Sequence, residues 1–140
     1  MSPKRLRPLI EAAKRARKYA YCPYSRYPVG AAVLAGSGRI YTGVNVETPT
    51  LIAHICAERN AIFSAFTHGE RKILAVATVS KASTSCGACR QVILEFGVGD
   101  TPIYSVCLSP EGKERIIRTS ISRLMPQAHT GKKFGFKELP

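Results

Sequence analysis

Three cysteines in the sequence have the spacing of metal ligands. Cys86 and Cys89 form a Cys-x-x-Cys pair, and Cys56 lies 30 residues before Cys86. Both motifs are expected to open helices, where free N–H groups and the helix dipole favour the thiolate. The thiolate is the form of cysteine that binds zinc. Three protein ligands leave one tetrahedral position for water, which is typical of a catalytic zinc site rather than a structural one.

Charged residues beside these cysteines could do acid–base chemistry. Glu58 follows Cys56 by two residues, an offset that places its carboxylate beside the metal without ligating it. There it can take a proton from a zinc-activated water and pass it on, as a general base and then a general acid. Three thiolates around Zn²⁺ leave a net negative charge that makes the water a weaker acid. Arg59 and Arg90, each of which directly follows a site residue, are expected to offset that charge by hydrogen bonding.

Each of these residues also has a simpler interpretation. The Cys-x-x-Cys pair can be a redox pair, as in thioredoxin-like folds. Cys56 can be a buried apolar cysteine, and Glu58 with Arg59 can be part of a solvated helix face. The occurrence of both cysteine motifs at helix starts favours the metal site.

Helices and strands alternate along the chain that carries these motifs. Apolar periodicity predicts helices over 6–20, 54–66 and 87–96, and a short one around 121–124. Strands are predicted over 27–35, 40–46, 72–80, 103–108 and 114–118. This order predicts an α/β fold, a three-layer α/β/α sandwich with a five-stranded mixed sheet. With no repeat and no obvious linker, residues 1–140 are expected to form one domain with a basic first helix and a basic tail over about 126–140.

The charge of the chain is concentrated at its two ends. The chain has 140 residues and a net charge of +12, of which residues 21–110 contribute only +2. Such ends are more typical of solvated helix faces and tails than of a nucleic-acid surface, so a nucleic-acid partner is not expected. Apolar residues make up 45% of the chain, which argues against disorder.

The sequence also indicates in which cellular compartment the protein is expected. No apolar run approaches the roughly 18 residues that span a bilayer, so a membrane protein is not expected. The basic start is not followed by an apolar stretch, which argues against a signal peptide. Five cysteines without such a signal favour a reducing compartment, and we expect the protein to be cytoplasmic.

Five short stretches in a fixed order carry a resemblance to a known family. The sequence resembles the small zinc-dependent cytidine deaminases of pyrimidine salvage, of the three-cysteine type, over about residues 15 to 128. The stretches are 20–25 (AYCPYS), 27–32 (YPVGAA), 41–47 (YTGVNVE), 55–59 (ICAER) and 86–91 (CGACRQ). The resemblance implies a cytidine deaminase-like fold and hydrolytic deamination at C4 of cytidine or deoxycytidine, which gives a uracil nucleoside and ammonia.

The resemblance also implies roles for individual residues. Zn²⁺ is held by the three cysteines, and Glu58 moves protons to the ring nitrogen and to the leaving amine. Asn45 and Glu47 take the family's role of holding the ribose hydroxyl, and Tyr27 stands where the family usually has a phenylalanine packed on the base. The family's common form is a homotetramer with shared active sites.

Four departures from the family pattern qualify these expectations. Ser85 replaces the proline before Cys86, a change we expect to be tolerated, and Thr48-Pro49-Thr50-Leu51 replaces a segment that touches the sugar and a neighbouring subunit. The C-terminal aromatic that closes over a neighbouring subunit's base falls on His129. The longer basic tail offers Phe134 or Phe136 instead.

These departures leave other functions open. One is deamination of a modified cytosine nucleoside, as in the similar blasticidin S deaminases. Another is deamination of a cytosine nucleotide or RNA, with Lys132 and Lys133 as phosphate contacts. A zinc-stabilised nucleic-acid-binding module without catalysis is disfavoured, because a structural zinc has no use for Glu58.

Overall fold

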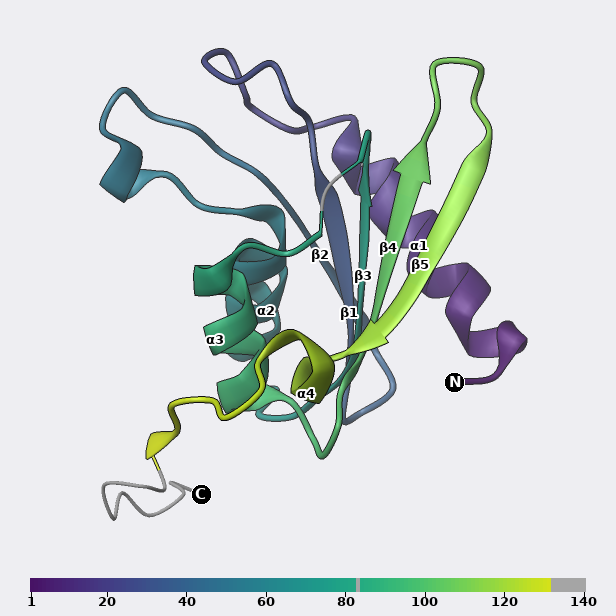
Figure 1. Cartoon of the computed structure of the whole chain (residues 1–140), viewed down its shortest axis with the longest axis vertical. Helices are drawn as coiled ribbons and strands as arrows, with labels where there is room; N and C mark the ends of the chain where they lie inside the picture. Colours follow the sequence, from purple (N-terminus) through teal and green to yellow (C-terminus); the bar gives the residue numbers. More distant parts are fainter. Residues whose placement is uncertain (83, 132–140) are drawn as a thin grey trace.

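A five-stranded mixed sheet forms the centre of the protein (Figure 1). The computed structural model describes residues 1–82 and 84–131. The strands are β1 (Gly30–Ala35), β2 (Ile40–Val44), β3 (Ile73–Ser80), β4 (Pro102–Leu108) and β5 (Glu114–Ser120). Their order across the sheet is β2-β1-β3-β4-β5. Neighbouring strands are antiparallel except for β3 and β4, which are parallel, so the predicted mixed sheet is confirmed.

Helices cover both faces of this sheet. They are α1 (Pro3–Arg17), α2 (Ala57–Thr67), α3 (Gly87–Phe96) and α4 (Ile121–Leu124), whereas the short 3-10 helix η1 (Leu51–Ala53) buries no residue. α1 buries Leu9 and Ala13 against one face, in a core cluster that includes Ala32 and Ala77. α2, α3 and α4 bury Ile62, Ile93 and Ile121 in a second cluster on the other face. The predicted three-layer sandwich is therefore confirmed (Figure 1).

Several predicted boundaries were wrong, in two cases for reasons that matter to the site. The helix predicted over 54–66 begins at Ala57, because Ile55 exchanges both backbone hydrogen bonds with Val46 at 3.0 Å and must stay extended. The strand predicted from residue 27 begins at Gly30, since the backbone before it bonds to the Asn45 side chain. The first helix begins at Pro3 rather than residue 6, because proline is compatible with the first helical position, and it ends at Arg17.

The architecture brings the starts of α2 and α3 together on one face of the sheet. α2 follows the loop after β2, and α3 follows the loop after β3. No helix among residues 1–82 and 84–131 is both long and apolar enough to cross a membrane.

Candidate active site

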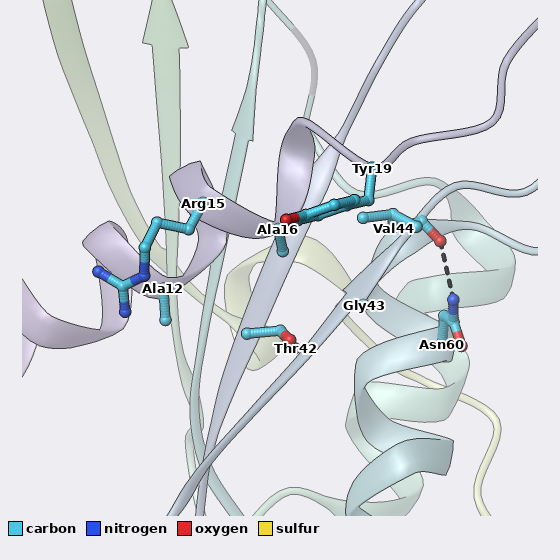
Figure 2. A pocket seen from close by; sticks show the side chains of 8 residues that line it. All are labelled: Ala12, Arg15, Ala16, Tyr19, Thr42, Gly43, Val44 and Asn60. Atoms are coloured by element: carbon cyan, nitrogen blue, oxygen red, sulfur yellow. Dashed lines mark hydrogen bonds between the residues drawn. The ribbon is translucent and has the colours of Figure 1, made fainter.

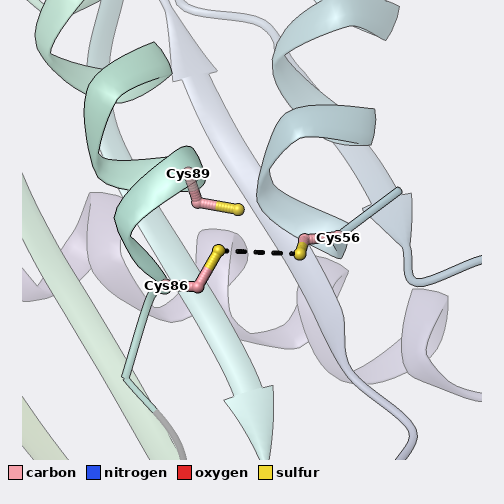
Figure 3. A group of neighbouring side chains, drawn as sticks. All are labelled: Cys56, Cys86 and Cys89. Atoms are coloured by element: carbon pink, nitrogen blue, oxygen red, sulfur yellow. Dashed lines mark hydrogen bonds between the residues drawn. The ribbon is translucent and has the colours of Figure 1, made fainter. Parts of the chain in front are cut away.

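Three cysteine side chains converge where α2 and α3 begin (Figure 3). Cys56 is the residue before the first turn of α2, Cys86 holds the same position at α3, and Cys89 lies in the first turn of α3. Their sulfur atoms all lie within 4.8 Å of one another, and the Sγ atoms of Cys56 and Cys86 are 3.8 Å apart. Cys89 is fully buried, whereas Cys86 is exposed. The structure therefore brings together the three predicted metal ligands.

The spacing of these sulfur atoms fits zinc. Two thiolates of a tetrahedral site with Zn–S bonds of about 2.3 Å lie about 3.8 Å apart, which is the separation of Cys56 and Cys86. The donor set is also soft thiolate, which selects zinc over magnesium or calcium. These three cysteines would hold a zinc ion and would leave its fourth position for water, and Cys86 is exposed.

The Glu58 carboxylate lies at this cluster in an almost dry environment. Glu58 is 6% exposed, and its Oε2 accepts a hydrogen bond from the Cys89 thiol at 3.6 Å. Burial raises the pKa of Glu58, an effect that its own backbone N–H and the Ser85 hydroxyl oppose. A carboxyl group poised in this way can both accept and return a proton.

Two donors beside Cys56 favour its thiolate form. The Arg59 Nη2 donates to Cys56 Sγ at 3.6 Å, and the Nε2 of His54 lies 3.9 Å from the same sulfur. The neighbouring Cys89 side chain is the largest cause that lowers the pKa of Cys56 to about 4, with Arg59 and His54 adding to it. The pKa of Cys89 is raised in turn by the neighbouring Cys56 and by the burial of its sulfur.

The sequence analysis missed His54. Residues i and i+2 of an extended segment point to the same side, so the His54-x-Cys56 spacing ahead of the helix was the available signal. The expectation of a helix from residue 54 concealed it, because a helical backbone separates side chains two residues apart.

Arg90 was predicted to hydrogen-bond the cysteine sulfurs, but the structure gives it oxygen partners. Its guanidinium donates to the backbone oxygens of Ser85 at 2.8 Å and Leu124 at 3.2 Å, and to Thr84 Oγ1 at 3.4 Å. Arg90 therefore joins the approach to α3 to the end of α4, and its hydrogen bonds go to oxygen atoms rather than to the thiols.

The two residues expected to hold the ribose are buried beside the metal cluster and bonded to backbone. The Oδ1 of Asn45 accepts from the Val29 N–H, and its Nδ2 donates to the Tyr27 carbonyl, both at 2.9 Å. Oε1 of Glu47 accepts from the backbone N–H groups of Tyr24 and Ser25. Val46, which lies between these two residues, pairs with Ile55, one residue before Cys56.

Tyr27 lies on the segment that these hydrogen bonds hold. Its hydroxyl accepts from the Ala82 N–H at 2.8 Å and lies 3.5 Å from Ser80 Oγ. The phenol therefore has polar partners at the end of β3. A partly buried tyrosine hydroxyl requires such a hydrogen-bond partner.

Other features of the surface lie apart from the cysteines. A hollow of about 570 Å³ lies between α1, β2 and α2; Figure 2 shows its lining, with Asn60 Nδ2 donating to the Val44 carbonyl at 3.0 Å. At the other end of the chain, the His129 carbonyl accepts from Gln91 Nε2 at 3.0 Å. Phe134, Phe136, Lys132 and Lys133, the remaining candidates from the tail, lie outside the described residues.

Comparisons with known proteins agree on one kind of relative. A family model described as "Cytidine and deoxycytidylate deaminase zinc-binding region" matches residues 3–105. A cytidine deaminase of Sporosarcina psychrophila is 44% identical over 123 residues, which cover 86% of this chain and 88% of the relative. One of Halalkalibacterium halodurans is 40% identical over 87% of this chain and 92% of the relative. Among solved structures, a cytidine deaminase of Burkholderia pseudomallei superposes with a TM-score of 0.77 at 38% identity, covering 92% of this chain and 100% of that one.

Proposed function

The chain belongs to the cytidine and deoxycytidylate deaminase family, and from that premise we propose that it hydrolyses the exocyclic amine of cytidine or deoxycytidine. The products are uridine or deoxyuridine and ammonia. The observation that carries this function is the buried Glu58 carboxylate at a zinc-compatible cluster of Cys56, Cys86 and Cys89. A structural zinc site has no use for such a carboxylate.

The residues of the site divide the chemistry among them. Zinc, when bound by the three cysteines, supplies a Lewis acid that makes water nucleophilic at neutral pH. Glu58 takes the proton of the attacking water and delivers protons to the ring nitrogen and to the amine that leaves from C4. Arg59 donates to the Cys56 sulfur and offsets part of the thiolate charge.

Substrate recognition falls to the segments packed beside the cluster. Asn45 and Glu47 hold the ribose hydroxyl, and the Tyr27 ring lies against the base. Support for these roles comes from the burial of Asn45 and Glu47 and from the pairing of Val46 with Ile55.

A substrate panel tests this function. Zinc-loaded protein is mixed with cytidine, deoxycytidine, CMP and a short cytosine-containing RNA, and the loss of cytosine absorbance is followed. Cytidine and deoxycytidine should be converted faster than CMP or RNA, and a chelator that removes zinc should abolish turnover. Equal or faster conversion of CMP would shift the proposal to a nucleotide deaminase.

Glu58→Gln separates catalysis from metal binding. The amide keeps the size of the side chain and cannot carry the proton, so turnover should fall by at least about 100-fold. Zinc content should remain that of the wild type, because Glu58 is not a ligand. Substantial turnover in this variant would remove Glu58 from the role of proton carrier.

We also propose that the protein is a cytoplasmic homotetramer with shared active sites that serves pyrimidine salvage. Leu51 and Ile52 of η1 are 74% and 92% exposed, and Figure 1 shows η1 projecting from the sheet at the upper left. Such exposed aliphatic side chains, in the loop that follows Glu47, suit a contact with a second copy. Light scattering should give a mass of about 61 kDa, four times the 15.2 kDa chain, and Ile52→Asp should reduce it.

A further inference from the structure

Ser85 carries a buried hydroxyl at the entrance to α3. Its side chain is 1% exposed, and its Oγ has no hydrogen-bond partner among the described residues. Burial of an unpaired hydroxyl is unfavourable, so such an atom in a folded protein calls for a specific explanation. The family pattern has proline here, which has no hydroxyl, and we expected the change merely to be tolerated.

The backbone around this hydroxyl is held in place. The carbonyl of Ser85 accepts from Arg90 Nε at 2.8 Å, and the next residue, Cys86, precedes the first turn of α3. The side chain of Ser85 is consequently oriented by a fixed backbone rather than by a bond of its own.

Ser85 and Glu58 lie at the same cysteine cluster. Ser85 directly precedes Cys86, whose Sγ lies within 4.8 Å of Cys89 Sγ, and Cys89 Sγ lies 3.6 Å from Glu58 Oε2. The start of α3 meets the start of α2, with the sulfurs of Cys86 and Cys56 3.8 Å apart (Figure 3). Glu58 lies in that first turn of α2, and the Ser85 hydroxyl is among the groups that lower the pKa of its carboxyl against the effect of burial.

Zinc binding would leave Glu58 in need of this donor. In the metal-free cluster the Cys89 thiol donates to Glu58 Oε2 at 3.6 Å. A cysteine that ligates zinc has lost its proton, so that hydrogen bond ends when the metal binds. The Ser85 hydroxyl, which has no hydrogen-bond partner in the described chain, is then a free donor at the same cluster.

We propose that Ser85 is a positioning residue that donates its hydroxyl proton to the Glu58 carboxylate in the zinc-loaded protein and holds it toward the substrate. The proposal rests on the deaminase function proposed above. It predicts a defect in the turnover step, because Ser85 acts on the group that moves protons and not on the groups that hold the nucleoside.

The first experiment compares three zinc-loaded variants with the wild type on cytidine. Ser85→Ala should lower kcat roughly tenfold, the usual effect of losing a hydrogen bond to a charged group, with KM within about twofold of the wild type. Ser85→Thr keeps the hydroxyl and should stay within about threefold of the wild-type kcat. Ser105→Ala is the matched control, since it removes another buried, unpartnered hydroxyl, on β4, and should leave kcat unchanged.

The second experiment measures the contact without turnover. Urea unfolding of the zinc-loaded wild type, Ser85→Ala, Glu58→Ala and the double variant forms a double-mutant cycle. The two substitutions should be coupled by roughly tenfold in the unfolding equilibrium constant.

The outcomes distinguish this proposal from the function on which it rests. A wild-type protein without cytidine deaminase activity would refute the function. An active wild type with full kcat in Ser85→Ala, a threonine variant as slow as the alanine one, an equal loss in Ser105→Ala, or no coupling in the cycle would each refute the role of Ser85.

Discussion

Gly43 couples the edge of the sheet to α2, the helix that carries the Glu58 carboxylate. A Cβ atom added at Gly43 would lie 2.3 Å from the backbone nitrogen of Ala61 and 2.5 Å from the backbone oxygen of Ala57. Both atoms belong to α2, and backbone cannot turn aside as a side chain can. Figure 2 shows Gly43 beside Asn60 of the same helix. Gly43→Ala must therefore displace α2 or be accommodated by movement of β2.

The size of this displacement follows from the contact distances. Ordinary contact of a Cβ begins at 3.4 Å, so the 2.3 Å approach requires a shift of about 1 Å. Overpacking of this kind costs about 1–3 kcal/mol, and two backbone contacts point to the upper end, about 3 kcal/mol. Because Cys56 and Glu58 begin α2, the same shift would move one sulfur away from Cys86 and misplace the carboxylate. A misplacement of about 1 Å can lower turnover about 100-fold.

Three measurements test this reasoning. Urea unfolding should show the lost stability, a chelator competition should show weaker zinc retention, and kcat on cytidine should fall. Gly36→Ala is the control, because its Cβ would meet Lys72 Cβ at 3.3 Å, a side-chain atom remote from α2. If Gly43→Ala keeps the wild-type zinc affinity and kcat, the position of α2 does not depend on this contact and the argument fails.

Two further predictions concern ligands and pH. Cys89→Ser should lose zinc, whereas Cys107→Ser, a change at another buried free cysteine, should keep one zinc per chain by metal analysis. The pKa of Glu47 is lowered, chiefly by the Ser25 hydroxyl and then by the backbone N–H groups of Ser25 and Tyr24. The ionised Glu47 therefore stabilises the folded state fully above the ordinary pKa of a glutamate, and this contribution is lost as pH falls through the lowered value. Glu47→Gln should therefore reduce the acid sensitivity of thermal unfolding while keeping an acceptor for both N–H groups, and an unchanged pH dependence would contradict this.

The elements of the fold were predictable where one backbone pattern dominates. α3 has the predicted bounds, 87–96, with Cys86 extended just before its first turn and Gly97 just after its last residue. The ends of other elements were set by partners far away in sequence. Ile55 stays extended because Val46 pairs with it, and residues 27–29 leave the strand because Asn45 bonds to their backbone. Local periodicity carries no information about such partners.

The two arginines show the same limit within the site. Arg59 lies three residues after Cys56, a spacing that places both on one side of a helix start, and its bond to the sulfur was foreseeable. Arg90 directly follows Cys89, and adjacent residues of a helix point about 100° apart. Its guanidinium reaches Leu124, a contact that depends on where the chain returns after β5.

Asn45 and Glu47 have a structural role as well as a proposed ribose-binding role, and substitutions at either residue would affect both. Each already bonds to backbone of residues 24–29, the segment that carries Tyr27 toward the end of β3. Loss of either side chain would thus release that segment as well as the proposed ribose contact. A raised KM alone cannot separate the two effects, but the sugar can. Deoxycytidine and cytidine share the 3′-hydroxyl, so a lost contact to that hydroxyl and a loosened segment would each weaken the binding of both. A nucleoside that lacks the 3′-hydroxyl separates the two effects, because a loosened segment weakens its binding as well, whereas loss of the hydroxyl contact leaves its binding unaffected.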